Sequence, residues 1–376
     1  MSTTTSAQPL PALVAGGQVL ADVRGRLGII TLNRPGALNA LSLPMVRDLT
    51  TLLLHWAGDA AVLAVVLQGA GREGKPPAFC AGGDIRFFHQ AALAGDPRLE
   101  DFFTEEYALD HLIHAYAKPV IALLDGVTMG GGMGLGQGAR LRIVTEHSKL
   151  AMPETNIGLF PDVGGGWFLA RCPGHVGEYL ALTGEVLGAA DAIAFGLADA
   201  EQPSATLAAL VERLADAPFD TPEALLEAAR LGGLPSGDTR VAQWCEAIDQ
   251  HFSRPDLGQI VASLAADEGD FARRTLATLR KRSPLMLAVT LEQIRRARNL
   301  TLADDLRMER DLVRHAFHLH PGTAGETIEG IRALVIDKDH RPRWNPSRIE
   351  DVTPEMVTPF FQSPWPVHVH PLRELE

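Results

Sequence analysis

Two carboxylates stand in a segment where charge is costly. Residues 151–169 read AMPETNIGLFPDVGGGWFL, in which Glu154 and Asp162 are surrounded by apolar residues and glycines. Burying an unpaired carboxylate is unfavourable unless its pKa shifts, so acids in this setting are candidates for chemistry. Each also has a structural reading, because a Pro-Glu pair suits the first turn of a helix and an aspartate after a proline suits a turn.

Two glycine-bearing loops could supply partners for this chemistry. Residues 128–134 read TMGGGMG and residues 78–85 read AFCAGGDI, and each stretch follows an apolar run. Residues without a β-carbon let a ligand approach their backbone N–H groups closely, although a glycine triplet alone is more often a turn. Two such amides can form an oxyanion hole for a carbonyl oxygen that gathers charge. Together, the acids and the amides predict acyl chemistry.

Composition narrows the class of protein. The 376 residues include 34 basic and 46 acidic side chains, a net charge of −12, and 46% are hydrophobic. This length suits one large domain with an appendage or two domains, and the acidic balance disfavours nucleic acid or an anionic membrane as a partner. The three cysteines have no disulfide-like or metal-like spacing, which favours a reducing compartment. With no signal-like or membrane-spanning stretch, we expect a soluble cytoplasmic protein without a metal.

The elements that must position these groups alternate in the first half of the chain. Apolar runs predict strands at 27–32, 62–67, 120–124 and 141–144, with helices at 42–57 and 99–116 between them. This alternation implies parallel strands joined by crossovers. Beyond residue 200 the pattern predicts helices at 205–215, 221–231, 241–252, 257–265, 270–282, 285–298 and 302–317. We therefore expect an α/β first half and a helical second half.

Four segments together are similar to a known superfamily. LNRPGALNAL at 32–41, FCAGGD at 79–84, GVTMGGG at 126–132 and PETNIG at 153–158 resemble the enoyl-CoA hydratase/isomerase (crotonase) superfamily. Three further segments resemble its branch that hydrolyses hydroxyacyl-CoA thioesters: FTEEY at 103–107, MPETNIGLFPDVGGG at 152–166 and IDKDHRPRWNP at 336–346. The resemblance runs from about residue 27 to residue 346.

The resemblance implies a fold and a domain organisation. The fold is a crotonase-like spiral of strand-strand-helix turns followed by a helical C-terminal region. We expect a flexible N-terminus at 1–17, a core with the acyl-CoA site at 18–200, a helical region at 201–335 and a tail at 336–376. Oligomeric state is left open, with a homo-oligomer as one expectation.

The resemblance also assigns roles to single residues. It places the amides of Ala81 and Gly131 in the oxyanion hole, Glu154 at the principal catalytic carboxylate and Asp162 at a second acid. Glu106, Gly131, Glu154 and Asp162 would contact the acyl substrate, and Arg34, Ala37 and Leu38 lie in the loop used against coenzyme A. Coenzyme A is then part of the substrate, and no cofactor or metal is expected.

One departure from the superfamily pattern bears on the reaction. Hydratases carry a first catalytic glutamate just after the glycine triplet, where this chain has Gly134. Hydration of a double bond needs paired acid and base groups, whereas thioester hydrolysis needs no acid at this position. We expect Glu154 to attack the thioester carbonyl or to activate water, and Asp162 to orient or protonate. The alternatives are a hydratase or isomerase, and a non-catalytic acyl-CoA-binding protein.

Overall fold

The computed structural model describes residues 8–230, 237–320 and 322–376, and these divide into two compact units. Unit 1 comprises Met1–Gly83, Leu109–Leu150 and Leu187–Thr239, and unit 2 comprises Asp84–Ala108, Ala151–Val186 and Arg240–Glu376. The units are defined by contacts in space, so each of them combines segments from separate parts of the chain. The residues predicted as a flexible start include 1–7, which lie outside the described residues.

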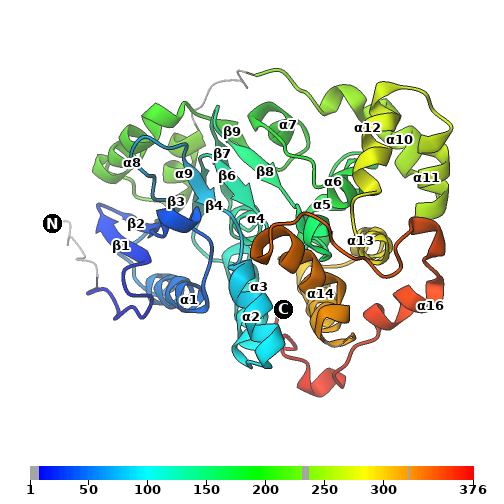
Figure 1. The fold of residues 1–376 in the computed structure, drawn as a ribbon. Helices are drawn as coiled ribbons and strands as arrows, with labels where there is room; N and C mark the ends of the chain where they lie inside the picture. Colours follow the sequence, from blue (N-terminus) through cyan, green and yellow to red (C-terminus); the bar gives the residue numbers. More distant parts are fainter. Residues whose placement is uncertain (1–7, 231–236, 321) are drawn as a thin grey trace. The chain divides into compact units, whose positions relative to one another are not determined.

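Unit 1 contains a six-stranded sheet in the order β1-β2-β3-β5-β7-β9 (Figure 1). β1 runs antiparallel to β2, and the other neighbours are parallel. The four predicted strands form its centre, although β3 begins two residues later than predicted. The bounds are β1 (Val19–Arg24), β2 (Leu27–Leu32), β3 (Ala64–Gly69), β5 (Val120–Leu124), β7 (Leu141–Val144) and β9 (Ala200–Glu201).

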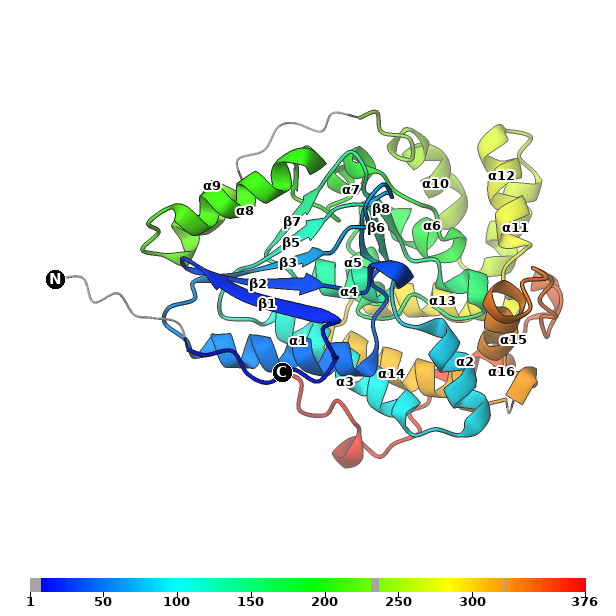
Figure 2. The same cartoon turned by 60° about the vertical axis from the view of Figure 1, so that its left-hand side comes forward.

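Helices cover both faces of this sheet, as Figure 2 shows. Leu27 and Ile29 of β2 pack in one core with apolar residues of α8 (Leu207–Asp216) and α9 (Pro222–Arg230). Gly28 points to the opposite face, where a β-carbon would lie 2.6 Å from the ring of Trp56 in α1 (Leu43–Ala57). Alternation of side chains along a strand therefore divides β2 between two helical layers, as expected for a strand buried on both faces.

A second, three-stranded sheet has the order β4-β6-β8. β4 (Ala78–Cys80) and β6 (Val127–Met129) are parallel, and β8 (Lys149–Ala151) completes the sheet. Sequence reasoning missed these strands because three residues are too few to show a periodic pattern. Helix α4 (Gly131–Gln137) follows β6, and α7 (Ala189–Ala194) is a further short helix of unit 1.

Unit 2 is mainly helical. Asp84 caps its first helix by accepting from the N–H of Phe87. Helix α3 (Arg98–His114) begins in unit 2 and continues into residues of unit 1. The other helices of unit 2 are α2 (Ile85–Ala94), α5 (Gly165–Leu169), α6 (Val176–Thr183), α10 (Cys245–Phe252), α11 (Leu257–Ala265), α12 (Asp270–Leu279), α13 (Pro284–Ala297), α14 (Leu302–His318), α15 (Glu326–Ile331) and α16 (Pro354–Val357).

The predicted order of an α/β first half and a helical second half is confirmed by these elements. The predicted helix at 221–231 ends one residue beyond the described segment, since residues 231–236 are outside it. Within the described ranges, no helix combines the length and the apolar content that a membrane crossing needs.

Candidate active site

The two glycine loops of unit 1 meet at the carboxyl ends of paired strands. β4 leads into Ala81 and Gly82, and β6 leads into Gly130 and Gly131. A β-carbon at Gly82 would lie 3.3 Å from the backbone nitrogen of Gly131, and one at Gly132 would lie 2.2 Å from the carbonyl oxygen of Cys80. The glycines therefore permit a close approach of the two backbones that side chains would prevent.

Gly131 is the first residue of α4, so its N–H has no acceptor within the helix. Gly130 ahead of it adopts φ +50, a conformation that favours glycine. A helix N-terminus carries a partial positive charge and directs N–H groups outward, which suits a developing oxyanion. The geometry of Gly131 agrees with the donor role that the resemblance implies.

The amide of Ala81 does not fit its predicted role as well. Its N–H donates to the carbonyl of Leu38 at 3.0 Å. The next strand-like contact of this loop is the N–H of Leu41 donating to the carbonyl of Gly82 at 2.8 Å, and the N–H of Gly83 takes part in neither bond. Gly83 is thus the better candidate for the second donor. Sequence reasoning passed over it because the direction of each amide depends on pairing with residues 38–41.

The loop predicted to bind coenzyme A is held by a buried asparagine. Asn39, fully buried, accepts from the N–H of Arg34 and donates to the carbonyls of Ala70 and Ala78. Leu38 and Asn39 have φ of 52 and 57, a left-handed conformation that is uncommon outside glycine. Arg34, Ala37 and Leu38 are half-buried in this loop. Their contact with coenzyme A stays a prediction.

The two acids of the 151–169 segment are both buried in unit 2. Glu154 begins the 3-10 turn Glu154–Ile157 and is 7% exposed, and Asp162, in the loop ahead of α5, is 5% exposed. Among the described residues, Glu154 Oε2 has no hydrogen-bond partner. Asp162 Oδ2 accepts from the hydroxyl of Tyr107 at 2.9 Å. Glu154 does begin a helical turn and Asp162 does stand in a turn ahead of α5, as their structural readings expected, but both side chains are buried rather than solvated.

Their surroundings separate the proton affinities of the two acids. Burial, and then the charge of Asp162, raise the pKa of Glu154 well above its ordinary value. Burial also raises the pKa of Asp162, to about 6, but the hydrogen bond from Tyr107 opposes this shift. When two carboxyls interact, the protons leave in two steps that belong to the pair. The first ionisation therefore places the charge on Asp162 and keeps the proton on Glu154.

Helix α3 contributes two neighbouring groups. Glu106 is 2% exposed, so its carboxyl group is buried rather than on a solvated face of the helix. Tyr107 is fully buried, and burial followed by the charges of Asp162, Glu309 and Glu106 raises its pKa. Tyr107 therefore stays a hydrogen-bond donor. Sequence reasoning missed it, although a tyrosine that ends the FTEEY segment was a usable signal.

Two acids of α14 support the loop that carries Asp162. Glu309 accepts from the N–H groups of Gly164 and Gly166, at 2.7 and 2.9 Å. Asp305 accepts from the N–H of Trp167 at 2.7 Å. These contacts join residues that are 138 to 145 positions apart in the chain. No local pattern could have predicted them.

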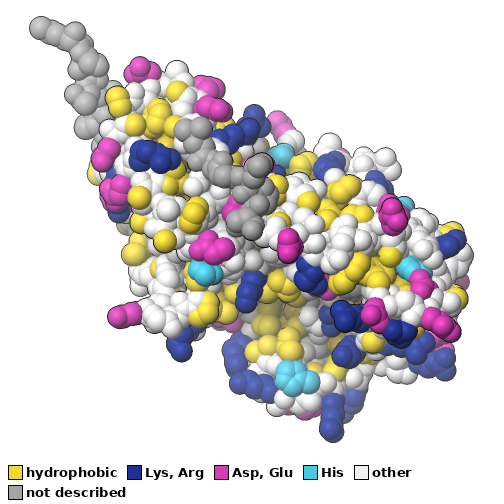
Figure 3. Space-filling model, turned by 90° about the horizontal axis from the view of Figure 1, so that it is seen from above, with side chains coloured by type: hydrophobic (Ala, Val, Ile, Leu, Met, Phe, Trp, Pro, Cys, Tyr) yellow, Lys and Arg dark blue, Asp and Glu magenta, His cyan; other side chains and the backbone are white. Residues whose placement is uncertain are grey.

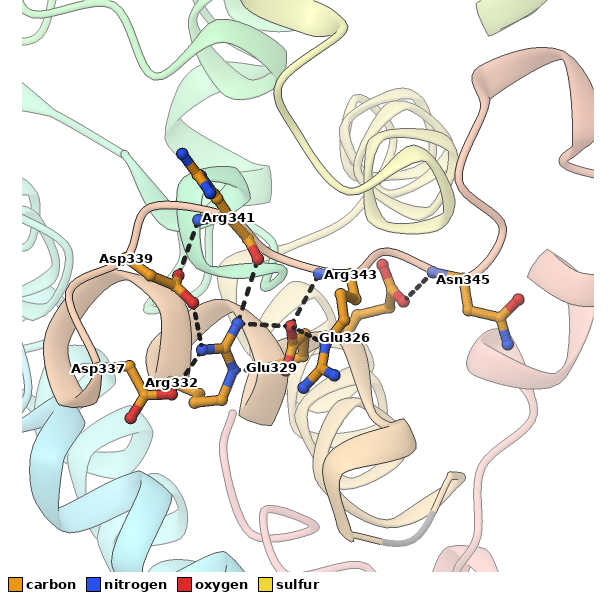
Figure 4. A network of polar contacts seen from close by, with 8 residues as sticks. All are labelled: Glu326, Glu329, Arg332, Asp337, Asp339, Arg341, Arg343 and Asn345. Atoms are coloured by element: carbon orange, nitrogen blue, oxygen red, sulfur yellow. Dashed lines mark hydrogen bonds and ion pairs between the residues drawn. The ribbon is translucent and has the colours of Figure 1, made fainter.

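The segment 336–346 is tied to α15 by charged groups, which Figure 4 shows. Arg332 forms ion pairs with Glu329 at 2.8 Å, Asp337 at 2.6 Å and Asp339 at 2.8 Å. Glu326 accepts from the N–H of Asn345 at 2.8 Å. The segment that resembles the hydrolase branch is therefore held against unit 2 by ion pairs and a hydrogen bond.

The helix that contains position 134 has no acidic residue. Gly134 lies inside α4, whose seven residues are all buried and include no carboxylate. The carboxyl group that a hydratase would use at this place is therefore missing from the helix.

Comparisons with known proteins agree with this architecture. The enoyl-CoA hydratase/isomerase family matches residues 27–361. A curated relative from Danio rerio, named 3-hydroxyisobutyryl-CoA hydrolase, mitochondrial, is 40% identical over 93% of this chain and 90% of its own. The chain belongs to the enoyl-CoA hydratase/isomerase family, and its crotonase-like fold is confirmed.

Two solved structures are similar over nearly their whole length. A structure described as an enoyl-CoA hydratase from Rhodobacter sphaeroides 2.4.1 is 40% identical, covers 92% of this chain and 97% of its own, and has a TM-score of 0.81. A carnitinyl-CoA dehydratase from Mycobacterium thermoresistibile is 35% identical, covers 96% of this chain and 100% of its own, and has a TM-score of 0.83.

The expected cytoplasmic location is contradicted by these comparisons. The Danio rerio relative and others of the same name are described as mitochondrial, and none of these names supports the cytoplasm. The error has a physical reason: three cysteines without disulfide-like spacing indicate a reducing compartment but do not distinguish one such compartment from another.

Proposed function

We propose that this chain hydrolyses an acyl-CoA thioester to the free acid and coenzyme A. The observation that carries the proposal is the buried pair of acids, Glu154 and Asp162. The chain also has Gly134 in α4, at the position where a hydratase needs an acid. After its first ionisation such a pair holds one charge and one proton, so it can both accept a proton from water and donate one to the leaving thiolate.

The donors to the thioester oxygen are the amides of Gly131 and Gly83. As the carbonyl carbon is attacked, its oxygen gathers negative charge, and each donor placed for that charge contributes about 10²–10³ in rate. Attack by water gives the acid directly. Attack by Glu154 requires that this residue first lose the proton it holds, and it gives a mixed anhydride that water then hydrolyses. In both routes the carbon–sulfur bond breaks and the thiolate takes up a proton.

The particular substrate we propose is 3-hydroxyisobutyryl-CoA, with a place in valine breakdown. Support comes from the name of the curated relatives and from Glu106, whose buried carboxylate can accept from a substrate hydroxyl. Coenzyme A brings phosphates to a chain of net charge −12, yet Lys and Arg side chains are exposed on the face in Figure 3. The overall negative charge therefore does not exclude an anionic ligand.

A hydratase is the second candidate, favoured by the names of the two similar structures. The two functions separate in one assay with purified protein. We expect thiol release from (S)-3-hydroxyisobutyryl-CoA and no loss of enoyl absorbance with crotonyl-CoA. Hydration of crotonyl-CoA without thiol release would establish the hydratase instead, and tight binding of coenzyme A without turnover of either compound would indicate a binding protein.

A further inference from the structure

The turn that carries Asp162 has an unusual backbone. Val163 adopts φ +56 and Gly164 adopts φ +82. A β-branched residue in the left-handed region is an outlier, and it persists only where the surroundings impose it. Because Val163 directly follows Asp162, whatever holds this turn also fixes the direction of the Asp162 carboxylate.

Two buried acids of α14 hold the turn through its backbone. Asp305 and Glu309 are both fully buried and lie four residues apart, on one face of the helix. Glu309 binds the N–H groups of Gly164 and Gly166, one to each carboxylate oxygen, and Asp305 binds that of Trp167. Three hydrogen bonds, at residues 164, 166 and 167, therefore hold the backbone that follows Asp162.

The other side of the turn is fixed through Gln293 of α13. Its amide donates to the carbonyl of Pro161 at 2.6 Å and to Glu309 Oε1 at 3.0 Å. The same glutamate is thus linked to the residue before Asp162 and to the residues after it. A shift of Glu309 would move both ends of the turn.

Gly166 shows how closely the acids approach. A β-carbon at this residue would lie 2.5 Å from Asp305 Oδ1. Gly166 is not among the glycines with positive φ, so its backbone conformation does not require glycine. The requirement for glycine at this position comes from the space that the Asp305 carboxylate occupies.

Other charged groups on α14 have a different task. Arg310 donates to Thr104 at 2.9 Å and pairs with Glu100, and Arg314 pairs with Glu100 at 2.7 Å, so these groups join α14 to side chains of α3. Glu309 and Asp305 instead bind backbone amides of the candidate catalytic segment. Helix packing alone does not call for that arrangement.

We infer that Glu309, assisted by Asp305, is a positioning residue that fixes the Val163 turn and thereby directs the carboxylate of Asp162. This inference rests on the proposed hydrolase function, in which Asp162 is one of the two acids. Glu309 touches no reacting atom in this scheme and acts through Asp162.

The main test compares Glu309→Gln with Asp304→Asn, an exposed acid on the same helix. Glutamine keeps the shape of the side chain but presents an amide donor where one of two N–H groups needs an acceptor. Because misplacing a catalytic group by about 1 Å can lower the rate by about 10²-fold, we expect kcat to fall by about that factor while KM is unchanged. Asp304→Asn should leave kcat as in the wild type.

A double variant separates positioning from a general structural loss. If Glu309 acts through Asp162, Glu309→Gln added to Asp162→Asn should lower kcat no further than Asp162→Asn alone. An equal fall in both backgrounds would overturn the inference, as would a Glu309→Gln enzyme with wild-type kcat. If Glu309→Gln does not fold, Asp305→Asn makes the same comparison through the amide of Trp167.

A measurement without substrate keeps this inference distinct from the proposed function. Amide hydrogen exchange at Gly164, Gly166 and Trp167 should be faster in Glu309→Gln than in the wild type, and unchanged in Asp304→Asn. A wild type that releases no thiol would refute the proposed function. Even then, faster exchange in the variant would support Glu309 as the support of the turn, and unchanged exchange would overturn it.

Discussion

In unit 1 the candidate catalytic groups are backbone amides, and strand pairing positions them. In unit 2 they are carboxyl side chains, and one of them, Asp162, is held by a hydrogen-bond partner of its own. The loops of Gly83 and Gly131 follow two parallel strands, so the strand register sets their separation. Asp162 instead depends on Tyr107 and on the turn held by Glu309. Amides are placed by the fold as a whole, whereas buried acids require a dedicated network.

The largest effect is expected from replacing Glu154, the principal acid of unit 2. Glu154→Gln should lower kcat for thiol release by about 10²–10⁴-fold, the usual contribution of a group that transfers a proton in the reaction. Glu292→Gln, an exposed acid paired with Arg296, is the control and should retain activity. A Glu154→Gln enzyme with the kcat of the wild type would remove Glu154 from the mechanism.

A proline at Gly131 tests the backbone side of the comparison. Proline is tolerated at the first position of a helix because that N–H has no helical acceptor, so Gly131→Pro deletes the donor and keeps the helix start. We expect kcat to fall by about 10²–10³-fold. Gly131→Ala keeps the N–H and is the matched control. Equal losses in the two variants would show that shape, rather than the amide, matters here.

The hydrogen bond from Tyr107 predicts the direction in which the pH dependence of kcat should shift. If one acid of the pair must be ionised, kcat should rise with pH through about 6, where Asp162 loses its proton. Because the Tyr107 bond lowers the pKa of Asp162, Tyr107→Phe should move this rise to higher pH. The measurement is kcat against pH for both enzymes. A shift to lower pH would contradict the assigned order of protonation.

The smallest effect concerns stability. Burial raises the pKa of Asp305 to about 7, whereas in the unfolded chain it ionises near its ordinary value of 3.8. Between these values the unfolded state binds fewer protons than the folded state, so the free energy of unfolding falls as pH rises. Asp305→Asn should reduce this fall, measured by urea unfolding across the window. Asp304→Asn should reproduce the wild-type slope.

These contrasts explain which features could be predicted from sequence. The strands at 27–32, 120–124 and 141–144 and the helix at 257–265 match the structure because an apolar period is a local signal. Glu154 and Asp162 were identified because charge in an apolar segment is also local. The partners of Asp162 were not, since Glu309 is more than a hundred residues away and nothing in its own helix marks it.

The choice between Ala81 and Gly83 shows a second limit. Both residues stand in one short glycine-bearing segment, and composition does not tell which amide points away from the neighbouring strand. That direction follows from the bond between Ala81 and Leu38, which joins residues 43 positions apart. Residue types predict that donors exist, and tertiary pairing decides which of them remain available.

The approach of Asp305 to Gly166 has a consequence for how this sequence can change over time. A side chain at position 166 and a carboxylate at position 305 exclude each other, because a β-carbon would lie 2.5 Å from the acid oxygen. In a lineage that first lost the acid at position 305, position 166 could change from glycine to a larger residue. In a lineage that still has the acid, a larger residue at position 166 would be selected against. The two positions should therefore be inherited as a pair, although no side-chain contact between them exists to reveal it.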